Sequence, residues 1–183
     1  TMGASAGLLL ASAATTNPRD GVLMADPAYP CNPRFVEAVG GEVHWITTDA
    51  TTQFQPTYTA LEAEATASDR TLMLAHPANP TGQAVPRAEL ERMIHWCLIT
   101  HRHLIVDEIY QSLAFNDALG SSLMISDQHF VVGSFSKYFN MTGWRLGWLV
   151  IPEYALEATQ RLAQHLFTVS YTHLRAHETS LHL

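Results

Sequence analysis

The sequence contains few cysteines, few charged side chains and only one lysine. Its two cysteines, Cys31 and Cys97, are too few for a disulfide framework and fit a reducing compartment such as the cytoplasm. Charged residues make up 15% of the 183 residues, and 17 acidic side chains outnumber 10 basic ones. The net charge of -7 argues against nucleic acid or an anionic membrane as the main partner. No apolar run approaches the roughly 18 residues of a membrane-spanning helix, so we expect no membrane partner.

The apolar content, 47% of the chain, is sufficient for one sizeable hydrophobic core. Apolar runs predict strands at 22–27, 42–47, 71–77, 103–110, 129–135 and 146–152. Helical patterns occupy 7–14, 33–39, 58–67, 86–100 and 153–167. Because strands and helices alternate at this spacing, the sequence predicts an α/β fold with a largely parallel sheet.

Residues 86–100 give the clearest helical pattern. Pro86 suits the first position of a helix. Apolar residues recur at the spacing of a single helix face, and that face is expected to comprise Leu90, Met93, Ile94, Cys97 and Leu98.

Polar side chains lie at the ends of four of the predicted strands or just beyond them. They are Asp26 and Tyr29, then Asn79, then Asp107 and Tyr110, and finally Ser134 and Lys137. In an open α/β sheet, ligands bind beyond the carboxyl ends of the strands. The sequence therefore predicts one site at this edge. Lys137 follows an apolar strand among small hydroxyl side chains; a surface lysine needs no such setting, whereas a lysine that bonds to a cofactor does.

Several motifs, in this order and at these spacings, resemble those of class I and II aminotransferases, the fold-type I enzymes that depend on pyridoxal phosphate (PLP). The motifs are ANPTG at 78–82, DEIY at 107–110 and SFSKYFNMTGWRLGW at 134–148. TMGASAGLLLA at 1–11 and DPAYPCN at 26–32 resemble the family's phosphate loop and ring-stacking segment. The resemblance implies a large PLP-binding domain of the aspartate-aminotransferase-like fold, a mostly parallel sheet flanked by helices in three layers. Since the family's chains are roughly twice as long, we expect the fold to be incomplete at both ends.

The resemblance assigns the catalytic chemistry residue by residue. Lys137 would form a Schiff base with the cofactor aldehyde and then, as a desolvated amine, carry the proton of the substrate Cα. Asp107 would keep the ring nitrogen protonated, so that the ring can act as an electron sink. Asn79 and Tyr110 would hydrogen-bond the phenolic oxygen of the ring, and Tyr29 would stack on its face.

The same resemblance implies a phosphate site at the start of the first helix. Backbone amides of Ala4 and Ser5 would donate to the phosphate. Ser134 would add a hydroxyl, and Arg145 a bidentate guanidinium. No residue matches the arginine with which the family grips the substrate carboxylate, so we assign none.

Simpler interpretations exist for each residue. A lysine after a strand is ordinarily exposed to solvent, Asp107 could cap a turn, and the two tyrosines could be core aromatics. Asn79 could belong to an ordinary Asn-Pro turn, Arg145 could pair with a carboxylate, and Ser136 is expected only to be small. His95, His101 and His103 do not have a recognised ligand spacing, so we predict no metal site.

The resemblance implies an aminotransferase that moves an amino group between an amino acid and a 2-oxo acid. The full-length protein would be a cytoplasmic homodimer. Two alternatives stay open: a PLP-dependent β-lyase or decarboxylase of the same fold, and the aminotransferase-like sensing domain of a transcription regulator.

The chain is expected to divide into two parts. Residues 1–169 would form the central part of the PLP-binding domain. Residues 170–183, SYTHLRAHETSLHL, break the apolar rhythm and resemble a translated sequencing adaptor, so we predict that they are not natural sequence.

Overall fold

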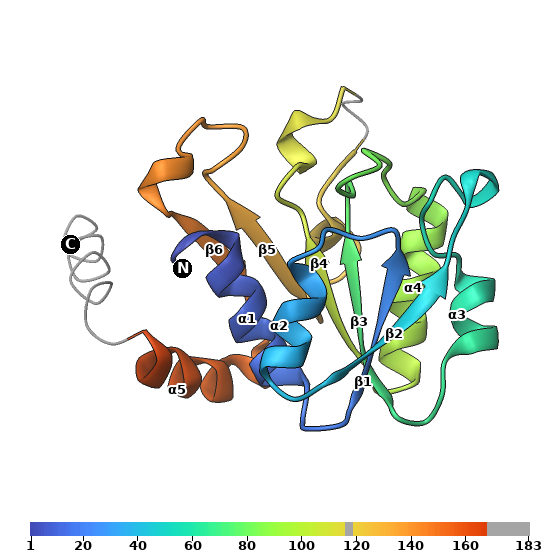
Figure 1. Cartoon of the computed structure of the whole chain (residues 1–183), viewed down its shortest axis with the longest axis horizontal. Coiled ribbons are helices and arrows are strands. Elements are labelled where there is room, and N and C mark those ends of the chain that lie inside the picture. The colour runs from blue at the N-terminus through green and yellow to red at the C-terminus, as the bar shows by residue number, and fades with distance from the viewer. Residues whose placement is uncertain (116–118, 168–183) are drawn as a thin grey trace.

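A six-stranded sheet forms the centre of the computed structural model, which describes residues 1–115 and 119–167 (Figure 1). The strands of this described part are β1 (Gly21–Asp26), β2 (Glu42–Thr47), β3 (Asp69–Ala75), β4 (His103–Asp107), β5 (Phe130–Ser134) and β6 (Gly147–Val150). The α-helices are α1 (Gly3–Thr15), α2 (Asn32–Ala38), α3 (Tyr58–Glu64), α4 (Arg87–Ile99) and α5 (Leu156–Leu166). Short 3-10 turns, labelled η, include η2 (Gln111–Leu113), η3 (Ser122–Met124) and η4 (Thr142–Trp144). The predicted tail at 170–183 lies outside the described residues.

The strands lie in the order β2-β1-β3-β4-β5-β6, and every neighbouring pair is parallel except β5 and β6. The prediction of a largely parallel sheet is confirmed. Because β6 is antiparallel to β5, the chain returns without crossing the sheet. The whole connection between them, residues 135–146, therefore stays at the edge where the parallel strands end.

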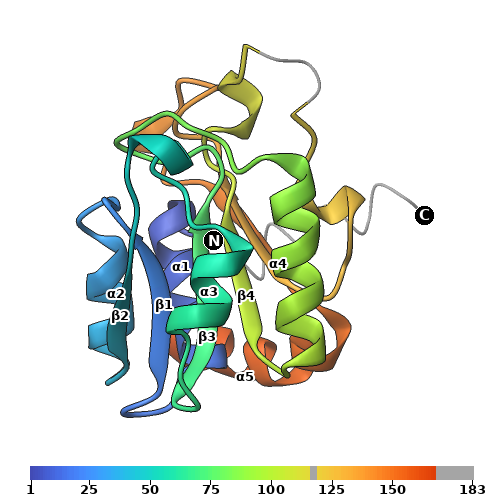
Figure 2. The same ribbon diagram turned by 90° about the vertical axis from the view of Figure 1, so that its right-hand side faces the viewer.

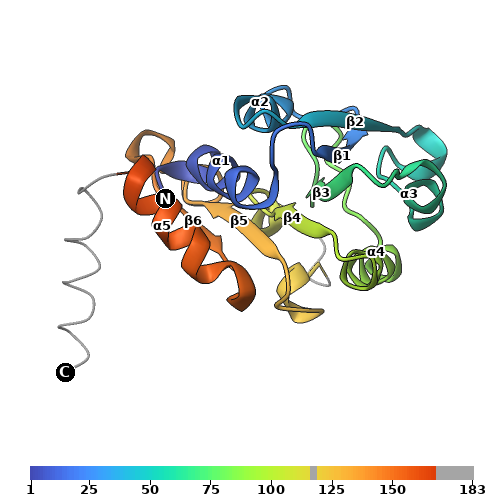
Figure 3. The ribbon, with the colours of Figure 1, turned by 90° about the horizontal axis from the view of Figure 1, so that it is seen from below.

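The sheet is the middle of three layers, as predicted. Helices α1 and α2 cover one face, while α3 and α4 cover the other (Figures 2 and 3). Helix α5 packs against α1 at the lower edge (Figure 1). Side chains alternate along β4, so Ile105 joins the core beneath α1, and Leu104 and Val106 join the core beneath α4.

The predicted elements are all present, with small differences at their ends. Strand β4 ends at Asp107 rather than at Tyr110, because residues 108–110 turn away from the sheet. Pro86 caps α4 instead of occupying its first position. Within α4, the prediction for Leu98 is wrong: its side chain is 42% exposed, while Trp96 is buried beneath the guanidinium of Arg102. The eight-residue step from Leu90 turns Leu98 to the outer edge of the stripe.

No helix of the part that the structure describes is both long and apolar enough to cross a membrane.

Gly147 is the point at which β6 meets the start of α1. Its backbone N–H donates to Thr1 O at 3.0 Å, and Thr1 N donates to Gly147 O at 2.8 Å. A Cβ at this position would lie 2.8 Å from both Gly133 O and the carbonyl carbon of Gly3. All of these atoms belong to the backbone, so a side-chain movement cannot relieve the clash.

We expect Gly147→Ala to lower the free energy of unfolding by about 1–3 kcal/mol, because the strand and the helix must separate. Gly143→Ala is the matched control, since a Cβ there meets nothing within 4 Å. The control should change stability by less than about 0.5 kcal/mol. Urea denaturation of both variants measures the difference, and equal effects would contradict the close packing at Gly147.

Candidate active site

A hollow of about 240 Å³ lies at the carboxyl edge of the sheet, between the start of α1 and the turns that follow β1, β3, β4 and β5. All nine residues predicted for the site line it: Ala4, Ser5, Tyr29, Asn79, Asp107, Tyr110, Ser134, Lys137 and Arg145. Asp26 does not line it and is exposed at the end of β1. The strand-end rule indicated Tyr29, Asn79, Asp107, Tyr110, Ser134 and Lys137, which lie up to 108 positions apart; Ala4, Ser5 and Arg145 followed from the family resemblance.

Asp107 is the buried carboxylate of the hollow. It follows Ile105 by two positions on β4, so its side chain lies on the α1 face of the sheet, and it is 7% exposed. Its Oδ1 accepts a hydrogen bond from Ile109 N at 3.1 Å. Burial raises the pKa of Asp107 to about 6; the Ile109 N–H opposes this rise, and the charge of Glu108 adds to it. Within residues 1–115 and 119–167 Asp107 forms no ion pair, so its carboxylate is available to a cationic group of a ligand.

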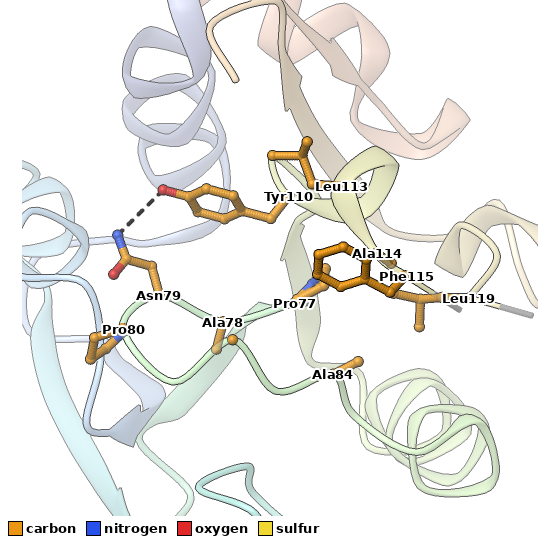
Figure 4. Close-up of a pocket in the computed structure, with 11 residues that line it drawn as sticks. Pro77, Ala78, Asn79, Pro80, Ala84, Tyr110, Leu113, Ala114, Phe115 and Leu119 are labelled. Carbon is orange, nitrogen blue, oxygen red and sulfur yellow. Dashed lines mark hydrogen bonds between the residues drawn. The ribbon is translucent and has the colours of Figure 1, made fainter. Parts of the chain in front are cut away.

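Lys137 lies across the hollow, with its Nζ 5.6 Å from the centre of the Tyr110 ring. Tyr110 Oη in turn accepts a long hydrogen bond, 3.5 Å, from Asn79 Nδ2, which Figure 4 shows. The expectation of a desolvated lysine is not met by the described residues, because Lys137 is exposed. The hollow is open to solvent on the side of its amine.

Arg145 and the start of α1 give part of the lining of the hollow a positive charge. Helix α1 begins at Gly3, and no side chain in the described part of the chain caps its first N–H groups. The Arg145 guanidinium lies directly over this start: a Cβ at Gly3 would be 2.5 Å from Arg145 Nη2. Arg145 Nη1 also donates to Thr142 O at 2.9 Å, which fixes the side chain. Free N–H groups of a helix together with a guanidinium favour an anion such as a phosphate.

Ser134 continues this polar wall through two hydroxyl neighbours. Its Oγ donates to Ser136 Oγ at 2.9 Å and accepts from Ser136 N at 3.0 Å. Thr142 Oγ1 donates to Ser136 O at 2.6 Å, which ties the far end of the loop to the same point. Ser136 was expected only to be small, yet it is buried and lines the hollow.

The sequence also gave no indication of Asn32, which lines the hollow at the start of α2 and is 3% exposed. Its Oδ1 is buried, and no described group donates a hydrogen bond to it. An Asn directly before a proline is typical of a helix start, so its sequence context indicates only a local structural role.

A second hollow, of about 540 Å³, adjoins the first (Figure 4). The two share Pro77, Asn79 and Tyr110. The remaining described residues of the second hollow carry no charge, and most are apolar: Ala78, Pro80, Gly82, Ala84, Leu113, Ala114, Phe115 and Leu119. Tyr110 and Asn79 therefore stand between a polar hollow and an apolar one.

Among the residues that the structure places, no group of three or more His, Cys, Asp or Glu side chains could hold a metal ion.

Comparison with known proteins places this chain within one family. The model of the family "Aminotransferase class I and II" matches residues 1–180. A curated relative, the valine–pyruvate aminotransferase of Mycobacterium tuberculosis, is 44% identical over 83% of this chain, a match that spans 39% of the relative. An aspartate aminotransferase of Streptomyces avermitilis is 31% identical over 90% of this chain and 42% of its own length. The chain thus spans about two fifths of the length of these relatives.

Solved structures agree with this placement. An aminotransferase from Mycobacterium tuberculosis has a TM-score of 0.86 at 41% identity, over 91% of this chain and 43% of that one. The aspartate aminotransferase of Thermotoga maritima has a TM-score of 0.85 at 30% identity, over 91% of this chain and 45% of its own. The match is therefore to one part of the larger structures. The chain belongs to the class I and II aminotransferase family.

Proposed function

We propose that the polar hollow binds PLP, and that the protein transfers an amino group between an amino acid and a 2-oxo acid. Class I and II aminotransferases use this cofactor. One observation carries the proposal: a buried carboxyl, the only lysine of the chain and an uncapped helix start beneath a guanidinium line a single hollow. The proposed protein is a cytoplasmic homodimer, and the amino acid that it uses is not assigned.

The donor and acceptor groups of the hollow fit the cofactor. Its volume of about 240 Å³ suits a small ligand. Asp107 supplies a negative group for a protonated ring nitrogen, and Arg145 with the start of α1 supplies positive groups for a phosphate. When bound, PLP supplies an aldehyde that reacts with amines and a ring that withdraws electrons from the substrate Cα.

The residues of the chain have distinct tasks in this proposal. Asp107 holds a proton on the ring nitrogen, because a cation beside it lowers the pKa of the carboxyl again and keeps it ionised. Lys137 provides the amine for the cofactor and accepts and returns the proton of the substrate Cα. Asn79 and Tyr110 donate hydrogen bonds to the phenolic oxygen. Tyr29 covers the ring from the rim of the hollow, since it is itself largely exposed.

The first prediction uses the fact that Lys137 is the only lysine. Reduction of the chain with borohydride in the presence of PLP should attach one cofactor, and peptide mapping should place it on Lys137. A visible absorbance band that depends on the lysine should accompany the adduct. Lys137→Ala and Lys137→Arg should both lack the adduct and the band; the Arg variant keeps the positive charge and so controls for electrostatic binding.

The one competing amine in this experiment is the α-amino group of Thr1. Burial lowers its pKa, which leaves more of it neutral and reactive. Mapping separates the two positions because they fall in different peptides. An adduct confined to Thr1 in the parent chain would contradict the proposed site.

The second prediction concerns the phosphate site. Arg145→Ala should weaken PLP binding by about 10–100-fold, because a charge-assisted pair is lost. Pyridoxal, which lacks the phosphate, is the matched ligand, and its affinity should change by less than about threefold. Absorbance titrations of the two ligands measure the difference, and an equal loss for both would place Arg145 elsewhere in the site.

The third prediction concerns the stability that the chain loses when the buried carboxyl of Asp107 ionises. The folded chain binds the proton of Asp107 more tightly than the unfolded chain, because the folded pKa of about 6 exceeds the ordinary aspartate pKa of 3.8. The free energy of unfolding therefore falls as the pH rises through this interval, by about 3 kcal/mol in total without cofactor. Asp107→Asn removes this pH dependence. The free energy of unfolding of the variant minus that of the parent should therefore be about 2–3 kcal/mol higher at pH 8 than at pH 4.

Urea denaturation of cofactor-free protein at the two pH values measures this difference. Asp26→Asn is the control, since it removes an exposed carboxylate from the end of β1. If Asp107→Asn and Asp26→Asn respond alike to pH, Asp107 is not a desolvated carboxyl.

A further inference from the structure

A chain of hydrogen-bonded polar side chains begins at Glu108, the residue after Asp107, and the proposed function gives it no task. Glu108 Oε1 accepts hydrogen bonds from Ser122 N at 2.7 Å and from Ser122 Oγ at 2.6 Å. His129 Nε2 lies 2.8 Å from the same Ser122 Oγ. Ser122 is fully buried and His129 is 1% exposed, while Glu108 is half-buried, so the bond between Ser122 and His129 forms out of contact with water.

The geometry determines the protonation state of His129. The single proton of the Ser122 hydroxyl points to the Glu108 carboxylate, which can only accept. Ser122 Oγ must then accept from His129, so the proton of the imidazole is on Nε2. Its Nδ1 is buried, and no described group pairs with it. A cationic His129 would carry a second N–H, on Nδ1, with no acceptor among the described groups, which makes the neutral form the stable one.

The charged and titratable groups around this chain agree with a neutral His129. Burial lowers the pKa of His129, and the carboxylates of Glu108 and Asp127 oppose that shift. His76 faces Glu108 from the end of β3; burial lowers its pKa as well, against the charge of Glu108. His76 Nδ1 accepts from Val85 N at 3.0 Å, so it too carries its proton on Nε2.

Glu108 is also the centre of the turn that presents Asp107 and Tyr110. Its backbone N–H donates to Val132 O at 2.9 Å, and its carbonyl accepts from Gln111 N at 3.0 Å. Its side chain is fixed by η3, whose Leu123 packs against the core beneath α4. The turn is therefore held to the sheet by its backbone and to the α4 layer by one carboxylate.

We propose that Glu108, Ser122 and His129 are positioning residues: they anchor the 107–110 turn from behind, with His129 as the neutral Nε2–H tautomer, and so orient Asp107 and Tyr110 toward the hollow. None of the three lines the hollow, so each acts through another residue. This proposal rests on the proposed function only in the tests that measure PLP binding.

The first test needs no cofactor. In the full 183-residue chain, long-range ¹H–¹⁵N correlation spectra report the tautomer of each histidine, and His129→Gln assigns the signal. We expect a neutral Nε2–H form at pH 7. Ser122→Ala and His129→Leu should shift the backbone amide signals of Ile109 and Tyr110 and speed their hydrogen exchange. Ser121→Ala, one position earlier, removes only the Oγ that accepts from Leu123 N and is the matched control.

The second test measures PLP affinity and the pH at which it is lost. Ser122→Ala and His129→Leu should weaken PLP binding by about tenfold, the effect of losing one buried hydrogen bond to a charged group. His129→Gln should restore most of the affinity, since its side-chain amide can donate to Ser122. Glu108→Gln keeps the hydrogen-bond acceptor but removes the charge that raises the pKa of Asp107, so it should move the acid limb of PLP binding to lower pH. If Glu108 contributed only to packing, Glu108→Gln would not move the pH at which PLP binding is lost.

Three results would overturn the proposal. The first is a cationic or Nδ1–H His129 at pH 7. The second is that Ser122→Ala changes the amide shifts and hydrogen-exchange rates of Ile109 and Tyr110 no more than Ser121→Ala does. The third is variants with lower melting temperatures whose PLP affinity per folded molecule equals that of the parent. If the parent itself binds no PLP, the proposed function fails, while the tautomer and the amide signals still decide the positioning role.

Discussion

The alternation of side chains along β4 is the constraint on which the rest of the site depends. Asp107, the last residue of β4, lies two positions after Ile105 and therefore faces the α1 layer, whereas Glu108 is the first residue of the turn that follows. Asp107 lines the hollow, while the Glu108 carboxylate accepts from Ser122 of η3, whose neighbour Leu123 packs against the core beneath α4. One strand end thus provides a ligand group and, in the next residue, its anchor. A shift of one residue in the register of β4 would turn Asp107 to the α4 face of the sheet and remove it from the hollow.

The antiparallel direction of β6 determines where the loop with Lys137 and Arg145 lies in the hollow. A parallel β6 would require a crossover that carries residues 135–146 away from the strand ends. The antiparallel return keeps Lys137 and Arg145 on one loop at the site edge, and Gly147 then brings that loop against the start of α1. The positively charged part of the hollow is therefore a contact between two segments that lie far apart in the sequence, and it depends on the absence of a Cβ at Gly3 and Gly147.

Much of this arrangement could be predicted from the sequence, because it follows from local rules. Apolar runs fixed the strands, and the first polar residues beyond them indicated Asp107, Asn79 and Lys137. Predictions failed where contacts with another segment of the chain determine whether a side chain is buried or exposed. Leu98 is exposed because the helix face against the sheet is narrower than the apolar pattern, and Lys137 is exposed because no described segment covers it. Asn32 could not be identified because its surroundings come from other strands. The Glu108–Ser122–His129 chain was missed because its partners are 14 and 7 residues apart and fit no local period.

The buried carboxyl of Asp107 also links cofactor supply to the survival of the chain. A ligand that binds only the folded state stabilises it in proportion to the logarithm of its concentration. PLP would do so with an added contribution, since it provides the countercharge that the folded chain lacks at this position. The folded fraction of the chain would then depend on the concentration of PLP. Where the cofactor is scarce, a larger fraction of molecules would open and be degraded, and the amount of protein would follow the amount of cofactor.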